Sequence, residues 1–246
     1  MARIAAEVGY SETAFAVPAK DNGWRVRYFS PESEVPFCGH ASIALGAALG
    51  QRQGAGIFAL KLNDAEITVE ARESSDGMTV TLASPSKHSS QASAEECDDA
   101  LALLGFTRVD LDDRLPPARI QGGADHFVLA LKDRARLAVM AYDLDVGRKV
   151  MRQHALVTIM LVHIADDQLF DGVTRLPLVG LSKAPRTVLP PPVFAGYLRD
   201  AGWPHGSAFT IRQGDDMGAP SNIYVALSDT LGSSIRVFGT ACHITL

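Results

Sequence analysis

Residues 35–41 read Val-Pro-Phe-Cys-Gly-His-Ala, and they lead into the apolar run Ala-Ser-Ile-Ala-Leu-Gly-Ala-Ala-Leu at 41–49. The run is apolar on nearly every side, which predicts a helix that begins at Gly39 and His40 and is buried in the middle of a sheet layer. The first N–H groups of a helix have no partner inside the helix and carry positive potential. We therefore expect this helix start to hold an anion such as a substrate carboxylate.

A carboxylate lies a short distance upstream, because residues 10–15 read Tyr-Ser-Glu-Thr-Ala-Phe. A glutamate and a histidine beside an anion site can move a proton on a bound carbon acid. Taken alone, Glu12 fits an exposed carboxylate at a strand end, and His40 fits a structural or capping residue. We favour catalysis for both because they accompany the same short motif. The residues thus outline a proton-transfer site and indicate an isomerase.

Composition sets the broad class of the protein. The 246 residues are 47% hydrophobic, which is enough for one large domain or two small ones. A net charge of −5 without a basic stripe argues against a nucleic-acid partner, and the longest apolar stretches, such as residues 155–164, are too short to span a membrane. No secretory segment opens the chain, and three scattered cysteines indicate a reduced, cytoplasmic protein. No metal-ligand spacing and no nucleotide-binding glycine loop is present, so we expect no metal and no cofactor.

Local patterns predict an α+β chain of two similar domains. The first domain covers residues 1–87, and residues 83–92 have the polar, Pro- and Ser-rich composition of a linker. The second covers residues 88–239, and a last strand at about 240–246 is free to return to the first domain. Ser93 and Glu96 form a capping-box pattern that starts a helix running to about Leu104. The site of such a protein is expected in the cleft between the domains.

Predicted helices and strands fill both domains. Helices are expected at residues 2–8, 41–49, 93–104, 146–154 and 194–201. Strands are expected at residues 14–17, 24–29, 56–62, 66–71, 78–82, 119–121, 126–131, 157–164, 168–170, 209–213, 223–227, 235–238 and 241–245.

Four segments of the chain carry a resemblance to a known family. They are Ile4-Ala5-x-Glu7-Val8 with Ser11-Glu12-Thr13; Arg27-x-Phe29-x-Pro31-x-x-Glu34-Val35-Pro36-Phe37-x-Gly39-His40; Gln213-Gly214-x-x-Met217-Gly218-x-Pro220-Ser221; and Ile235-Arg236-Val237-x-Gly239. In these segments the chain resembles the PhzF-like family of phenazine biosynthesis, within the diaminopimelate-epimerase-like superfamily. The resemblance implies two domains, each a barrel-like mixed sheet around a central helix. It also implies cofactor-independent acid/base proton transfer on a small carboxylated metabolite, and a homodimer.

The resemblance assigns roles to individual residues. Glu12 matches the family's catalytic acid/base, and His40 is the second residue that we assign to catalysis. Gly39 matches a position that lines the substrate site, and Ser11 precedes the glutamate as it does in the family. Cys38 matches the position of the catalytic cysteine of related amino-acid racemases, so it is a candidate second acid/base. An epimerase or racemase that uses Cys38 therefore stays open, beside the alternative that Cys38 is a small core side chain.

Two departures from the family pattern bear on fold and activity. An initial strand–turn segment with a Gly-Asn-Pro motif is absent, so we expect the N-terminal edge of the first domain to be incomplete. The family's acidic turn before the second-domain helix is also absent, since residues 180–192 read Gly-Leu-Ser-Lys-Ala-Pro-Arg-Thr-Val-Leu-Pro-Pro-Pro. Three consecutive prolines predict that no helix starts there and that residues 172–193 are irregular.

The same stretch has two interpretations. The codons possible for residues 173–192 permit a family-like sequence when the reading frame is shifted back by one base, although the family's aspartate is not recovered. The stretch is therefore either a natural loop or a frame-shifted segment. Because the acidic turn is lost, a catalytically silent homologue that acts as a binding or structural protein is the alternative of a different class.

Overall fold

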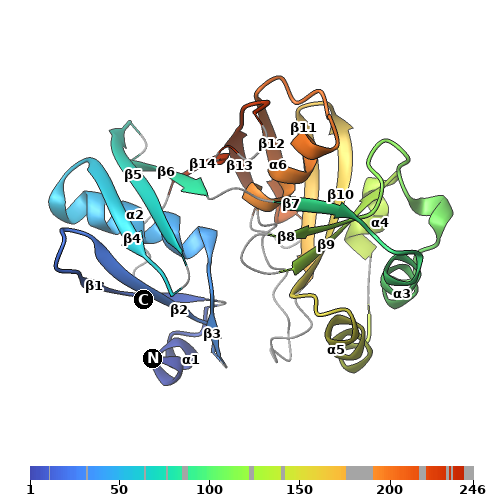
Figure 1. Cartoon of the computed structure of the whole chain (residues 1–246), viewed down its shortest axis with the longest axis horizontal. Coiled ribbons are helices and arrows are strands. Elements are labelled where there is room, and N and C mark those ends of the chain that lie inside the picture. Colours follow the sequence, from blue (N-terminus) through green and yellow to red (C-terminus); the bar gives the residue numbers. More distant parts are fainter. Residues whose placement is uncertain are drawn as a thin grey trace. The chain divides into compact units, whose positions relative to one another are not determined.

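The computed structural model describes residues 1–10, 12–31, 33–63, 65–75, 77–84, 88–121, 125–139, 142–175, 191–215, 220–230, 233 and 235–240. The chain divides into two compact units (Figure 1). Unit 1 is Met1–Pro85 with Ser234–Leu246, and unit 2 is Ser86–Ser233. The predicted second domain ran to residue 239, but strand β14 (Ile235–Thr240) pairs with a strand of unit 1, so the chain returns to unit 1 a few residues earlier.

The described residues of unit 1 form a mixed sheet with two helices. The helices are α1 (Ala2–Val8) and α2 (Gly39–Gln53), and the other strands are β1 (Thr13–Pro18), β2 (Trp24–Phe29), β3 (Glu34–Val35), β4 (Gly56–Lys61), β5 (Glu66–Ser74) and β6 (Gly77–Ser84). The strand order is β1-β2-β4-β5-β6-β14, and β3 pairs with β2 outside this path. Strands β2 and β4 run parallel. Among the described strands, β1 has one neighbour, β2, and therefore lies at an edge.

Small residues let α2 lie close to the sheet of unit 1. A Cβ atom on Gly46 would lie 2.8 Å from Cγ1 of Val80, and one on Gly50 would lie 2.7 Å from Cβ of Ala71. The helix starts at Gly39 as predicted but runs on to Gln53. It is not buried on every side, because Ala44 and Ala48 are exposed. The run 41–49 therefore forms a helix with one buried face rather than a fully enclosed one.

Unit 2 is a second mixed sheet with a buried helix. Its strands are β7 (His88–Gln91), β8 (Ala118–Gln121), β9 (Asp125–Leu131), β10 (Thr158–Asp166), β11 (Leu169–Arg175), β12 (Ala208–Gln213) and β13 (Ser221–Ala226), in the order β13-β12-β11-β10-β9-β8-β7. Its helices are α3 (Ala94–Leu104), the 3-10 turn η1 (Arg108–Asp110), α4 (Arg134–Val139), α5 (Leu144–Gln153) and α6 (Pro191–Asp200). The prediction of an α+β protein is confirmed.

Two local predictions were wrong. The supposed linker at 83–92 is partly strand, because β6 runs to Ser84 and β7 starts at His88 and pairs with β8. The three prolines do not prevent a helix, since α6 starts at Pro191. The first N–H groups of a helix have no partner inside it, so proline is tolerated in the first turn. Residues 176–190 and the predicted strand at 241–245 lie outside the described residues.

Helix α6 is anchored in unit 2 at both its middle and its end. The Phe194 ring packs edge-on against Phe170, with ring centroids 5.1 Å apart. At the end of the helix, Arg199 Nη1 donates to the carbonyl and hydroxyl oxygens of Ser233, both at 3.1 Å. Asp200 accepts bonds from the N–H and hydroxyl groups of Ser89, at 3.2 and 2.7 Å. The end of α6 thus holds β7 and the segment just before Ser234.

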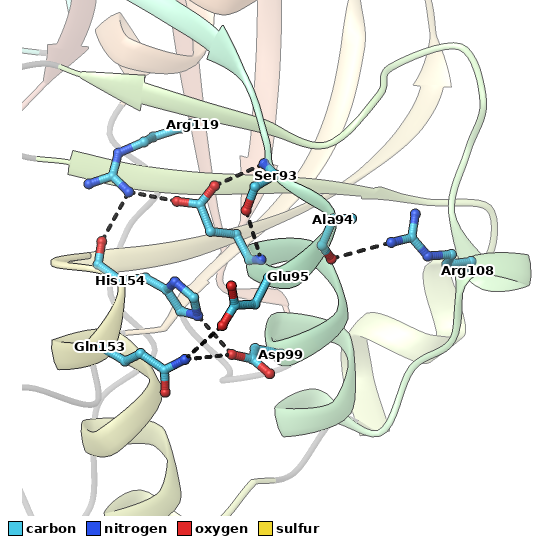
Figure 2. Close-up of polar contacts among 9 residues, drawn as sticks. Ser93, Ala94, Glu95, Asp99, Arg108, Arg119, Gln153 and His154 are labelled. Carbon is cyan, nitrogen blue, oxygen red and sulfur yellow. Dashed lines mark hydrogen bonds and ion pairs between the residues drawn. The ribbon is translucent and has the colours of Figure 1, made fainter.

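The predicted capping box at the start of α3 is confirmed and belongs to a larger polar network (Figure 2). Ser93 Oγ accepts from the N–H of Glu96, and Glu96 accepts from the N–H of Ser93. Arg119 Nη1 donates to Glu96 at 2.7 Å and to the carbonyl of His154 at 3.0 Å. The His154 ring lies 2.8 Å from Asp99. The network joins α3, β8 and the end of α5, so we assign its histidine a structural role.

Candidate active site

The turn between α1 and β1 presents Glu12. Helix α1 ends at Gly9, whose φ of 77° is in the left-handed region that glycine adopts most readily. Strand β1 begins at Thr13, so Glu12 lies directly at the strand's start, half-buried. Ser11, predicted to bind substrate, lies outside the described residues.

Cys38 occupies the N-cap of α2. Its backbone is extended, with φ −141° and ψ 113°, while Gly39 already begins the helix. The bond from the Ser42 N–H to the Cys38 carbonyl, at 3.0 Å, is the first backbone bond of α2. The N–H groups of the three residues before Ser42 therefore lack partners inside the helix, which makes this end of α2 electropositive.

The structure brings Glu12 and Cys38 into contact. Burial, followed by the negative charge of the nearby Glu12 carboxylate, raises the pKa of the Cys38 thiol to about 12. The thiol forms no regular N-cap bond, but the N–H groups of Ala41 and His40 act on the sulfur and oppose this rise. At neutral pH the thiol is protonated, so its S–H can donate to the Glu12 carboxylate. A carboxylate and a protonated thiol thus lie together beside the start of α2.

His40 lies on the first turn of α2, two residues after Cys38. Its side chain is exposed, yet desolvation by the surrounding protein lowers the pKa of its imidazole. The neutral ring therefore predominates at pH 7 and can donate one hydrogen bond to a ligand. Gly39 precedes it, and a Cβ there would lie 3.8 Å from Leu82, an ordinary contact. Packing does not demand glycine at this position; the missing side chain leaves the helix start open.

Two buried hydroxyl groups behind Cys38 were not predicted. The Tyr28 hydroxyl lies 2.6 Å from Ser42 Oγ, and Ser42 Oγ donates to the Cys38 carbonyl at 2.7 Å. The spacing of Cys38 and Ser42 in a predicted helix could have indicated the second bond, because residues four apart face each other. Nothing in the sequence indicated that Tyr28 joins them from a strand.

The family-like segment that begins at Arg27 contains an ion pair that stabilises unit 1. Arg27 donates from Nε and Nη2 to the two carboxylate oxygens of Glu34, at 2.8 and 2.6 Å. The Arg27 guanidinium, together with the amide of Asn63, lowers the pKa of Glu34 to about 2. This pair closes the turn between β2 and β3, so the sequence motif here is structural.

The described residues also show what this part of the chain lacks. No group of three or more His, Cys, Asp or Glu side chains among them could hold a metal ion. None of their helices is both long and apolar enough to cross a membrane. The predicted loss of an acidic partner in the second domain concerns residues 176–190, outside the described part of the chain.

Comparison with known proteins gives the chain its relatives. The family model of phenazine biosynthesis-like proteins, PhzC-PhzF, matches residues 1–245. The uncharacterized isomerase YfhB of Bacillus subtilis is 25% identical over 254 residues, covering 98% of this chain and 84% of YfhB. The uncharacterized isomerase YddE of Escherichia coli O157:H7 is 29% identical over 160 residues, so the match spans 62% of this chain and about half, 52%, of YddE.

Solved structures share the fold. A protein described as a predicted epimerase from Pseudomonas aeruginosa has a TM-score of 0.83 at 20% identity, with 97% of this chain and 83% of that one covered. A PhzF-family protein of Bacillus anthracis has a TM-score of 0.80 at 19% identity, covering 98% and 85%. A hydroxyproline epimerase of Agrobacterium vitis reaches 0.64 at 12% identity, covering 93% and 71%. The predicted family and fold are confirmed, and the named relatives support an enzyme of the isomerase type.

Proposed function

The chain belongs to the phenazine biosynthesis-like (PhzC-PhzF) family, and from this premise we propose that it moves a proton along or across the carbon skeleton of a small carboxylated metabolite, without a cofactor. The observation that carries the proposal is the contact of the Glu12 carboxylate with the Cys38 thiol at the start of α2. A carboxylate base beside an electropositive helix end can remove a proton from carbon while the helix end stabilises the negative charge that develops.

In the proposed reaction the substrate carboxylate binds near the first turn of α2. Gly39 leaves this turn open, and the neutral ring of His40 donates a hydrogen bond to the substrate. Glu12 takes a proton from the carbon next to the carboxylate and returns it to another carbon of the same molecule. The substrate of this reaction carries a carbon–carbon double bond next to the carbon that loses the proton. The electron pair of the broken C–H bond forms the new double bond, and the pair of the old double bond forms the new C–H bond with the proton from Glu12, so no oxidant is needed.

The alternative of a two-base epimerase that uses Cys38 is less well supported by the geometry. Such an enzyme needs its acid and its base on opposite faces of one carbon. Glu12 and Cys38 instead contact each other, and burial keeps the thiol protonated with a pKa of about 12. An isomerase with Glu12 as the single acid/base fits this arrangement better. Cys38 then serves as a hydrogen-bond donor that orients the Glu12 carboxylate.

The proposal also covers the location, the oligomeric state and the partners of the enzyme. We expect a cytoplasmic homodimer that acts on a small metabolite and uses no nucleic-acid or membrane partner. Size-exclusion chromatography with light scattering measures the oligomeric state directly. A mass of one chain would remove the homodimer from the proposal without affecting the chemistry.

Proton exchange tests the proposed activity. The purified full chain is incubated in deuterated water with a panel of small carboxylic acids that carry hydrogen on the carbon beside the carboxylate, and incorporation is followed by NMR. Deuterium that appears at a second carbon, with movement of a double bond, indicates isomerisation. Deuterium at the original carbon together with the stereoisomer inverted at that carbon, and with no movement of a double bond, indicates epimerisation or racemisation. Absence of exchange across the panel, with the folded state verified by circular dichroism, would favour the catalytically silent homologue.

A further inference from the structure

We propose that Tyr28 and Ser42 are positioning residues whose buried hydroxyl chain holds the Cys38 peptide, and thereby the Cys38 thiol, beside Glu12. The inference deepens the proposed function and rests on it for its catalytic consequence. Its structural part concerns only residues of unit 1 and can be tested by itself.

The number of protons that the hydroxyl groups carry determines which group donates in each hydrogen bond. The Cys38 carbonyl accepts two bonds from Ser42, one from its N–H at 3.0 Å and one from its hydroxyl at 2.7 Å. The single hydroxyl proton of Ser42 is therefore used toward Cys38. The Tyr28 hydroxyl, 2.6 Å from Ser42 Oγ, must then be the donor of their shared bond. The order of donation is Tyr28 to Ser42 to Cys38.

Burial protects the hydrogen bonds that run from Tyr28 through Ser42 to Cys38. Tyr28 is 1% exposed and Ser42 is 0% exposed, so water does not compete for their hydroxyl groups. Burial also raises the pKa of Tyr28 to about 12, which keeps its hydroxyl protonated and a donor throughout the neutral range. The Tyr28 ring is itself held by an edge-on contact with Phe37, with centroids 6.3 Å apart.

The row of hydroxyl groups ends at the Cys38 carbonyl, and this end point indicates a role in positioning beyond fold stabilisation. Two apolar side chains of similar shape would fill this core without any polar group to satisfy. The hydroxyls instead converge on the carbonyl of the residue that carries the sulfur, at the point where the backbone changes from extended to helical. Holding that peptide fixes the direction of the Cys38 side chain, and a positioned group needs such support to keep its geometry.

The test compares Tyr28→Phe and Ser42→Ala with a matched control, Tyr197→Phe. Tyr197 is also buried and also donates its hydroxyl to a backbone carbonyl, that of Pro116, but it lies on α6 in unit 2. Three quantities are measured in the full chain. They are the rate of Cys38 alkylation by iodoacetamide between pH 7 and 10, resolved from the other cysteines by peptide mass mapping; the kcat and KM of proton exchange; and the urea midpoint.

In Tyr28→Phe and Ser42→Ala the loosened thiol should regain hydration, so its pKa should fall. We expect alkylation of Cys38 at pH 9 to rise about tenfold or more, since one pKa unit changes the thiolate fraction tenfold below the pKa. We expect kcat to fall about tenfold with KM little changed, because positioning affects the transition state rather than binding. Tyr197→Phe should shift the urea midpoint only.

Unchanged Cys38 alkylation in both variants would overturn the inference, even if the variants were less stable. If the wild-type chain catalyses no exchange, the proposed function fails, while the alkylation profiles still decide whether the two hydroxyls position the thiol. If alkylation accelerates but kcat is unchanged, the residues do not act in catalysis and the positioning proposal is rejected for the reaction.

Discussion

Gly50→Ala tests why α2 can lie so close to the sheet of unit 1. A Cβ atom at this position would lie 2.7 Å from Cβ of Ala71 and 2.9 Å from Sδ of Met78. Carbon atoms in good contact are separated by about 3.5–4.0 Å, so roughly 1 Å must be gained by moving the helix or the strand. The Met78 side chain can rotate away, but the Cβ of Ala71 moves only with the backbone of β5.

The magnitude follows from two opposing effects. Replacing glycine by alanine inside a helix favours folding by about 1 kcal/mol. Overpacking a core costs about 1–3 kcal/mol, and the rigid neighbour at Ala71 places this site near the upper end. The expected net loss is therefore about 2 kcal/mol in the free energy of unfolding of unit 1.

Urea unfolding followed by Trp24 fluorescence, in a Trp203→Phe background, reports unit 1 separately. The control Ala48→Gly, on the exposed face of α2, should lose about 1 kcal/mol through helix propensity alone. Adding Ala71→Gly to Gly50→Ala should recover part of the loss, with a favourable coupling energy. A Gly50→Ala chain as stable as the wild type, or one that shows no coupling with Ala71→Gly, would refute the close-packing argument.

Two further predictions concern polar contacts. The folded-state pKa of Glu34 lies below its ordinary value of 4.5 because of Arg27. The stability that this carboxylate contributes is therefore present above pH 4.5 and is lost as the pH falls toward 2. Glu34→Gln should flatten that part of an acid-unfolding curve, and an unchanged curve would count against the ion pair. Asp200→Asn should weaken the bonds to Ser89 and speed hydrogen exchange of the β7 amides while β10 stays protected; equal protection of β7 in both proteins would show that the anchor is not needed.

Local signals made several elements predictable. The Ser93 and Glu96 capping box located the start of α3, and the apolar run after His40 located α2. Strand β7 was missed because its residues, His-Ser-Ser-Gln, have a loop-like composition and gain their structure from pairing with β8. The start of α6 at Pro191 differs from the prediction because proline disfavours the interior of a helix but not its first turn.

In the candidate site, too, local motifs were predictable from the sequence, and contacts between different elements were not. Glu12, Cys38 and His40 were recognisable because each belongs to a short segment with family-like spacing. The approach of Glu12 to Cys38, and the hydroxyl groups of Tyr28 and Ser42 that lead to Cys38, join residues of different elements. Such contacts depend on how a strand and a helix are packed, which periodicity and composition do not specify.

The central claim is that Glu12 carries the proton, and solvent exchange measures it most directly. With the best substrate of the panel, the exchange rate constant in deuterated water is compared among the wild type, Glu12→Gln and Glu7→Gln, the last being the same substitution on the exposed face of α1. Glu12→Gln should lower kcat by about 100-fold or more, since positioned acid/base groups contribute 10²–10⁴, while its urea midpoint and the activity of Glu7→Gln stay near wild type. Exchange by Glu12→Gln within a few-fold of the wild-type rate would contradict the assignment of Glu12 as the acid/base.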